Sequence, residues 1–291
     1  MSIDRLQEKI RKTKNPLAID FGVLQEHIPP QLLEKSGSFL EAYGIFCKEL
    51  LFGLKDIVPA VRFHFVDFAI MGGLGVEILR DVLSFAKSQG YYIFLDGIEA
   101  LSPMSAQRNA DALFGENVLC AFDALIVTAY PGSDVIRPYT ERIKSSGKDL
   151  FVVARTSNKT AVEIQDLLSG SRLTHMAMAD IANRFASPFV GKCGYSSLGL
   201  VAAASSADSL RSLRGKFKDM FYLLDGCDYP NANAKNCSYA FDKLGHGAVA
   251  CAGISVTAAW REEREPEDYV ACAARSADRL KKNLNRYITI L

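Results

Sequence analysis

The chain has 291 residues, of which 49% are hydrophobic and 23% are charged, and its formal net charge is +1. This composition is typical of a folded protein with a large core, and the small net charge excludes a broad field that would attract nucleic acid or a membrane surface. The N-terminal stretch MSIDRLQEKIRKTKN is polar from its start, and no apolar run has the length that spans a bilayer. We therefore expect a cytoplasmic protein with one domain over residues 1–291.

Short apolar runs that predict strands alternate with helical patterns along the whole chain. The predicted strands cover residues 17–23, 58–65, 91–97, 123–130, 149–157, 198–205, 219–226 and 246–255. The predicted helices cover residues 38–56, 75–90, 105–115, 135–147, 160–169, 206–217 and 236–245, with a last helix and an apolar end over 278–291. Near-continuous apolar strands are typical of parallel strands buried on both faces. Eight such βα units predict a single (β/α)8 TIM barrel of the α/β class, and an open doubly wound sheet is the alternative.

Polar residues gather at the ends of the predicted strands, where a barrel keeps its active site. Arg62 and His64 alternate with apolar residues, so both point to the same side of their strand. Asp20 and Asp96 each end an apolar strand and need a hydrogen bond or a cation. We take Asp96, Arg62, His64 and Asp225 as candidate catalytic residues. The alternatives are a structural histidine and internal salt bridges.

The stretch ARTSNKTAVEIQDL, at residues 154–167, is a strand that ends in hydroxyl and amide groups before a helical pattern. Thr156, Ser157 and Asn158 could hydrogen-bond the edge of a planar ligand, and together with Asp20 they are the candidate substrate-binding residues. The alternative is that Asn158 or Thr160 only caps a helix.

No spacing supports a metal site or a nucleotide cofactor. The acids and the histidine at the strand ends, with Asp228, form no sequence pattern for a metal, and the seven cysteines show no metal-ligand or redox spacing. There is no Walker-type loop and no G-x-G-x-x-G. The loop LLDGCDYPNANAKN is acidic, and the loop after the last predicted strand has no cation before Arg261, so a phosphate anchor is not expected. We expect a small-molecule substrate, no cofactor and no metal.

Several segments, taken in chain order, resemble orotidine 5'-phosphate decarboxylase of the longer bacterial subfamily. RTSNKTAVEIQDL resembles its Arg-Thr-Ser-Asn segment, DALIVTAYPGSDVIRPY resembles its Asp-Ala-x-x-x-Asn-Pro-Tyr-x-Gly-x-Asp segment, and AFDKLGHGAVACAGISVTAAW resembles its closing strand and helix. The resemblance implies a (β/α)8 barrel that forms a homodimer with sites at the shared face. It also implies cofactor-free decarboxylation of orotidine monophosphate to UMP.

The chain departs from the family pattern at the catalytic loop. The resemblance aligns the third strand with Asp-x-Lys-x-x-Asp, keeps Asp96 as the first acid, and places Ile98 at the lysine and Leu101 at the last acid. Arg62 stands where the second strand of the family has a lysine. Ile98 can neither stabilise nor protonate the carbanion of that reaction, and charge placed in advance is usually the largest catalytic contribution.

The binding positions are partly kept. The resemblance matches Asp20 to an acid that contacts ribose hydroxyls and Ser157 to the contact with the pyrimidine amide. The arginine that normally follows the eighth strand aligns near Gly253.

These features leave three functions open. The chain could be a diverged lyase or decarboxylase-type enzyme that acts on a different, nucleoside-like and non-phosphorylated substrate. It could be a non-catalytic homologue that binds a small molecule or a protein. It could also be an ordinary orotidine 5'-phosphate decarboxylase.

Overall fold

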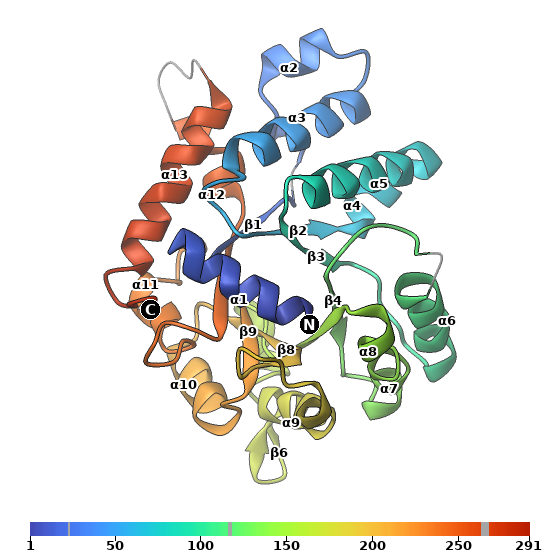
Figure 1. Ribbon diagram of the computed structural model, residues 1–291, viewed down its shortest axis with the longest axis vertical. Coiled ribbons are helices and arrows are strands. Elements are labelled where there is room, and N and C mark those ends of the chain that lie inside the picture. The colour runs from blue at the N-terminus through green and yellow to red at the C-terminus, as the bar shows by residue number, and fades with distance from the viewer. Residues whose placement is uncertain (23, 116–117, 263–267) are drawn as a thin grey trace.

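A computed structural model describes residues 1–291 of the chain except 23, 116–117 and 263–267. Eight parallel strands close into a barrel in the order β1-β10-β9-β8-β5-β4-β3-β2, with helices around the outside (Figure 1). The strands are β1 (Leu17–Asp20), β2 (Ala60–His64), β3 (Tyr92–Asp96), β4 (Ala124–Thr128), β5 (Asp149–Val153), β8 (Ser196–Ala203), β9 (Met220–Asp225) and β10 (Ala248–Ala252). The predicted TIM barrel is thereby confirmed, and the open sheet is excluded.

The helices lie around the barrel (Figure 1). They are α1 (Ser2–Thr13), α2 (Pro30–Lys35), α3 (Phe39–Leu54), α4 (Phe65–Ala69), α5 (Gly72–Ser88), α6 (Pro103–Phe114), α7 (Arg137–Thr140), α8 (Ile143–Ser146), α9 (Thr174–Ala186), α10 (Ala207–Lys216), α11 (Ala234–Ser238), α12 (Ile254–Thr257) and α13 (Tyr269–Leu284). Within the described residues, no helix has both the length and the apolar character needed to cross a membrane.

Two predicted helices are wrong, and the helix predicted over residues 236–245 is helical only as far as Ser238, where α11 ends. Residues 160–169 form a 3-10 turn at Lys159–Glu163 and then β6 (Leu168–Ser169), which pairs with β7 (Arg172–Leu173) in a small antiparallel hairpin. Residues 135–147 hold only the short helices α7 and α8, because Pro138 has no backbone N–H to continue an earlier turn. The structure also contains α1, α2 and α9, which the sequence patterns did not predict.

Helix α1 closes the N-terminal end of the barrel. Its fully buried Ile3, Leu6 and Ile10 recur at helical spacing and pack in one cluster with inward-facing residues such as Ala18 and Tyr92. The helical spacing of these apolar residues predicts a helix, which was missed because the N-terminus was treated as polar. A closed floor leaves the opposite, carboxyl end of the strands as the open mouth.

The barrel interior is packed with aromatic side chains. Phe151 makes edge-on contacts with Phe94 and Phe221, whose ring centroids lie 5.1 and 6.3 Å away. Gly199 on β8 leaves room for this ring, since a Cβ there would lie 2.4 Å from Phe151. Inward residues alternate along each strand, so the next inward layer toward the mouth contains Asp20, Arg62, Asp96 and Asp225.

Asp149, at the start of β5, is a carboxyl group in the closed half of the barrel. It is fully buried, and its Oδ2 accepts a hydrogen bond of 2.7 Å from the Tyr92 hydroxyl. Burial raises its pKa to about 7, although the Tyr92 hydrogen bond acts in the opposite direction. The folded protein therefore holds a proton that the unfolded chain releases near pH 4.

This proton predicts a pH-dependent stability. Because the folded state binds more protons between about pH 4 and 7, the free energy of unfolding should fall as pH rises through that window, by about 2–4 kcal/mol. Asp149→Asn should remove this part of the slope and be at least as stable as the wild type at pH 8. Urea denaturation at several pH values measures both. An Asp149→Asn protein with the wild-type slope would contradict the assignment.

Candidate functional site

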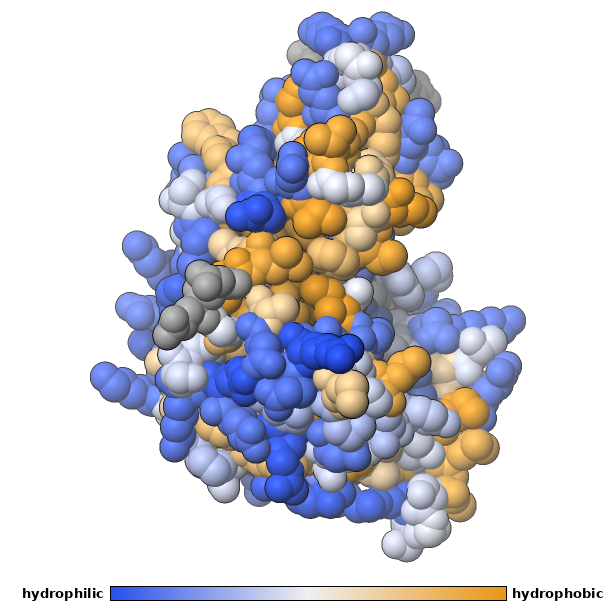
Figure 2. All heavy atoms as spheres, turned by 90° about the vertical axis from the view of Figure 1, so that its right-hand side faces the viewer, coloured by the Kyte–Doolittle hydropathy of each residue, from blue (hydrophilic) through white to orange (hydrophobic). Residues whose placement is uncertain are grey.

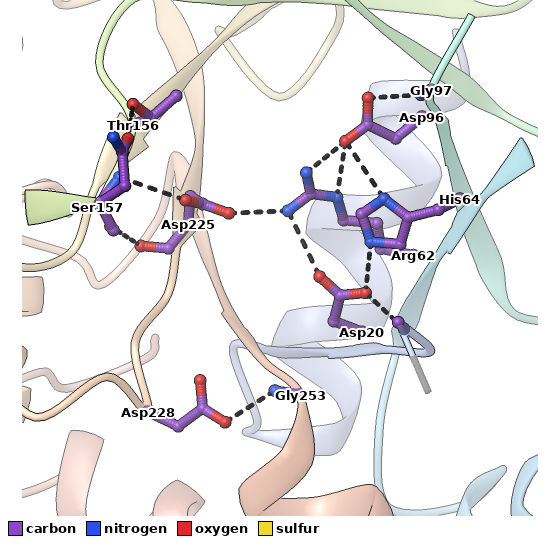
Figure 3. Close-up of polar contacts among 12 residues, drawn as sticks. Asp20, Arg62, His64, Asp96, Gly97, Thr156, Ser157, Asp225, Asp228 and Gly253 are labelled. Carbon is purple, nitrogen blue, oxygen red and sulfur yellow. Dashed lines mark hydrogen bonds and ion pairs between the residues drawn. The ribbon is translucent and has the colours of Figure 1, made fainter. Parts of the chain in front are cut away.

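The candidate site lies in the last inward layer of the barrel, at the carboxyl ends of β1, β2, β3 and β9. The register places Asp20 beside Arg62 and His64 beside Asp96 on neighbouring strands. Figure 3 shows these side chains and Asp225 turned toward one another across the mouth. Arg62 and His64 lie on the same side of β2, as their alternation in the sequence predicts.

Arg62 is the centre of the arrangement. Its Nε lies 3.1 Å from Asp96 Oδ2, and its Nη2 pairs with the same oxygen. Its Nη1 lies 2.8 Å from Asp225 Oδ1 and 3.4 Å from Asp20 Oδ2. One guanidinium thus joins carboxylates from three strands, and its side chain is only 10% exposed. Asp20 and Asp96 thus form internal salt bridges with Arg62, which is the alternative that the sequence left open for these two acids.

The charges of the cluster support one another. Burial acts against the charge of Arg62, but the acids, led by Asp20 and Asp96, outweigh it and hold the pKa of Arg62 well above its usual value. Burial likewise acts to raise the pKa of Asp20, but its hydrogen bond with His64 and the charge of Arg62 lower it overall. The cluster keeps Asp20 and Arg62 ionised at neutral pH.

His64 is the titratable group of the cluster. Its Nε2 lies 2.7 Å from Asp20 Oδ1, while its Nδ1 lies 3.7 Å from Asp96 Oδ2, beyond hydrogen-bond distance. Burial lowers the pKa of His64, but the hydrogen bond and charge of Asp20 outweigh burial, so the pKa is raised. A protonated His64 therefore has one proton held by Asp20 and another, on Nδ1, that a ligand could accept.

A cavity of about 610 Å³ opens from this cluster toward the loops after β9 and β10. Its lining includes Asp20, Arg62, His64 and Asp225. It also includes Cys251 of β10 and residues that follow β9 and β10, namely Asp228, Tyr229, Gly253, Ser255, Arg261 and Glu262. This volume suits a small-molecule ligand. Most of the second group was not predicted from the sequence, because only the folded loops bring it to the mouth.

Asp228 has a distinct position within the cavity. Its Oδ2 accepts hydrogen bonds from the backbone N–H groups of Gly253, at 2.9 Å, and Ser255, at 3.2 Å. The sequence marked Asp228 as a member of an unsupported metal group and as one of the acids in a loop that would repel a phosphate. Its partners lie more than twenty residues further along the chain, and no local pattern predicts that contact.

The candidate binding residues after β5 are largely engaged with their own loop. Thr156 Oγ1 donates to Asn158 Oδ1, and the Gln165 side chain bonds both the N–H and the hydroxyl of Thr156. Ser157 is bound to Asp225: its hydroxyl donates to the backbone carbonyl, and its N–H lies 3.4 Å from Oδ2. None of Thr156, Ser157 and Asn158 lines the cavity described above. Ser157 holds Asp225 in place at the mouth, while Thr156 and Asn158 bond within their own loop.

The acids at the mouth surround the guanidinium of Arg62. Within the described ranges, no group of three or more histidine, cysteine, aspartate or glutamate side chains is arranged to hold a metal ion. Arg62 already supplies the positive charge that a cation would bring to Asp20, Asp96 and Asp225.

The catalytic-loop positions named by the family resemblance differ in environment. Ile98 is partly buried against the core between strands and helices, and Leu101 is 81% exposed. Among the residues that the structure describes, the cations within ion-pair distance of Asp96 are Arg62 and His64, and no lysine is among them.

Comparisons with known proteins point to one family. Residues 116–259 match the model of the orotidine 5'-phosphate decarboxylase / HUMPS family. The chain is 28% identical over 280 residues to orotidine 5'-phosphate decarboxylase of Petrotoga mobilis, with 95% of each chain covered. It is 24% identical to the Clostridium perfringens protein of the same name, with 99% of each covered.

Solved structures share the fold at lower identity. The orotidine 5'-monophosphate decarboxylase of Plasmodium berghei superposes with a TM-score of 0.77 at 14% identity, covering 98% of this chain and 100% of that one. The OMP decarboxylase of Leishmania donovani gives a TM-score of 0.71 at 20% identity, covering 97% and 99%. The family match and the curated relatives together support a place for the chain in the orotidine 5'-phosphate decarboxylase superfamily.

The cluster predicts a large effect of removing its cation. Arg62→Met should lower the free energy of unfolding at pH 7 by about 3–5 kcal/mol, because three mostly buried carboxylates then lose their shared partner. Part of the loss should be recovered at low pH, where the acids become protonated. Chemical denaturation measures both effects. Arg142→Met, which breaks an exposed pair with Asp111, should cost at most about 1 kcal/mol. Equal losses in the two variants would contradict the central position of Arg62.

Proposed function

We propose that the chain is a diverged lyase that decarboxylates a nucleoside-like substrate without a 5'-phosphate, using His64 as the proton donor. The observation that carries the proposal is His64 itself. Its imidazole is held by Asp20, lines the cavity, and stands beside Asp96, the one acid of the family's catalytic loop that the chain keeps. The superfamily's lysine position is Ile98, so a different group must supply the proton.

The step is a balanced proton transfer. The bond between the substrate carbon and its carboxylate breaks, CO2 leaves, and the electron pair stays on the carbon. Protonated His64 then delivers its Nδ1 proton to that carbon, and solvent restores the proton afterwards. Asp20 holds Nε2, and its hydrogen bond and charge outweigh burial and raise the pKa of the ring, which supports this assignment because a donor must hold its proton near the working pH.

The charge of the mouth favours a substrate without phosphate. Asp20, Asp225, Asp228 and Glu262 line the cavity, and Arg62 is already neutralised by its partners. An added dianion would meet an acidic surface and would have to compete with these carboxylates. Ribose hydroxyls, by contrast, are donors that carboxylates accept, which supports a neutral nucleoside-like ligand.

Two other functions remain in competition. The full pairing of Arg62 and the apolar Ile98 and Leu101 favour a non-catalytic homologue that binds the same class of ligand. The names of the curated relatives favour ordinary orotidine 5'-phosphate decarboxylase. Against the latter stands the ion-pair environment of Asp96, which within the described chain holds Arg62 and His64.

We also propose that the protein is a homodimer through the side formed by α4, α5 and the loop before α6. Figure 2 shows a broad apolar area on this side of the molecule. Val66, Ile70, Leu74, Leu101 and Met104 are exposed by 55–83%. Exposed apolar area of this kind is typical of protein interfaces. His64 directly precedes α4, so a second copy at this side would lie close to the mouth.

Orotidine and orotidine monophosphate separate the functions. We expect uridine to form from orotidine, and UMP to form from orotidine monophosphate at least about tenfold more slowly, because the phosphate meets the acidic mouth. Chromatography of the products measures both rates. UMP formation at the faster rate would restore the ordinary decarboxylase, and thermal stabilisation by orotidine without any turnover would favour the non-catalytic homologue.

His64→Gln tests the proton donor on the same substrate. We expect it to lower kcat by about 100-fold or more with little change in KM, since general acid catalysis contributes about 10²–10⁴-fold. The wild-type rate should fall as pH rises through the raised pKa of His64. His246→Gln, a control at the exposed contact with Leu291, should leave the rate and its pH profile unchanged. Wild-type kcat in His64→Gln would contradict the assignment.

The apolar side predicts a dimer that a charge disrupts. Light scattering should give twice the chain mass for the wild type and one chain mass for Ile70→Glu, because a buried unpaired charge is costly at an interface. Leu168→Glu, on the exposed β6–β7 hairpin, should remain dimeric. A monomeric wild type, or an Ile70→Glu dimer, would rule out this interface.

A further inference from the structure

We propose that Asp228 acts as a built-in substitute for a ligand phosphate and that it determines specificity for substrates without one. The inference rests on the proposed function, because it concerns the same cavity, and it names the residue that excludes the phosphate. A carboxylate of the chain, and not an anion from solution, takes the donors at this end of the site.

The contacts of Asp228 are those expected of a bound anion. One carboxylate oxygen, Oδ2, accepts from the N–H groups of both Gly253 and Ser255 (Figure 3 shows the contact with Gly253). Backbone N–H groups are frequent donors to phosphate oxygens, and bonds to a charged acceptor are stronger than those between neutral groups. The two donors are therefore satisfied before any ligand arrives.

The position in the barrel supports the comparison with phosphate. Gly253 and Ser255 follow β10, the last strand of the barrel, and Asp228 follows β9, the strand before it. Phosphate groups in TIM barrels are commonly bound by the loops after these two strands and by the start of a short extra helix. Here the short helix is α12, and an aspartate from the neighbouring loop already occupies its first N–H groups.

Further donors belong to the same part of the site. The hydroxyl of Ser255 is buried without a hydrogen-bond partner. Arg261 lines the same cavity with a side chain 46% exposed, and its ion pair with the exposed Glu26 is long, at 3.8 Å. Once the Asp228 carboxylate is removed, two backbone N–H groups would lose their acceptor in a cavity that the Arg261 side chain also lines. This set of donors could hold a phosphate dianion, so one side chain accounts for its exclusion.

Calorimetric titration of uridine, UMP and inorganic phosphate tests the proposal. The wild type should bind uridine better than UMP and should not bind inorganic phosphate measurably. Asp228→Ala should gain at least about tenfold in affinity for UMP and bind inorganic phosphate, with the affinity for uridine little changed. Asp228→Asn keeps an acceptor oxygen without the charge and should show a smaller gain. Glu262→Gln removes one acid of the same cavity but frees no N–H group, and it should show none.

The possible results are separable. If uridine binds the wild type and neither Asp228 variant gains affinity for UMP, the role of Asp228 as a phosphate substitute is refuted while the proposed ligand class stands. Equal gains in Glu262→Gln and Asp228→Ala would reduce the effect to net charge and would also refute it. If uridine binds no variant but Asp228→Ala acquires phosphate binding, the role of Asp228 as a phosphate substitute stands and the proposed function fails. Circular dichroism checks that each variant folds, and Asp228→Gly replaces Asp228→Ala if the latter does not.

Discussion

The mouth of this barrel depends on one guanidinium that satisfies three carboxylates. Each acid ends a different strand, so each would be costly to bury alone, and Arg62 is the cation that all of them share. The arrangement holds β1, β3 and β9 at fixed positions around β2. It also limits what Arg62 can do, because a guanidinium with its donors engaged is a structural cation, and this is why we propose His64 as the proton donor.

The alternation of a parallel strand places the two cations. Arg62 and His64 are separated by one residue, so both enter the barrel, one layer apart, and both reach Asp20 and Asp96. The sequence resemblance aligns Ile98 with a lysine of the family's third strand. In this chain Ile98 packs against the core, and the second strand supplies both of the cations that pair with Asp96 within the described residues.

Much of the fold could be predicted from the sequence, and the reasons are local. Eight apolar runs, each followed by a helical or turn pattern, are enough to place the strands, and the polar residues that end several of these runs mark the mouth. The predictions were wrong where local pattern and tertiary context differ. Residues 160–169 have helical spacing but form a turn and a hairpin, and α1 is recognised only once its apolar face has a barrel floor to cover. Thr156 and Asn158 were expected to face a ligand because they follow an apolar strand, but in the folded chain their side chains bond within their own loop.

Contacts between loops that are distant in the sequence could not be predicted from local patterns. Asp228 and Gly253 meet only because β9 and β10 are neighbours, and that contact changes the interpretation of the whole cavity. An acidic loop suggests mere repulsion of phosphate, whereas an acid on two backbone N–H groups suggests replacement of it. A site that keeps the sugar-facing acid Asp20 and fills its own anion position is consistent with a nucleoside as ligand.

The most direct measurement of this account is the ratio of the wild-type affinities for uridine and UMP, determined side by side at pH 7. The account predicts tighter binding of uridine, since Asp228 occupies the backbone N–H groups of Gly253 and Ser255 and its charge repels a phosphate. Tighter binding of UMP would contradict it and would return the chain to the ligand class that its relatives' names describe.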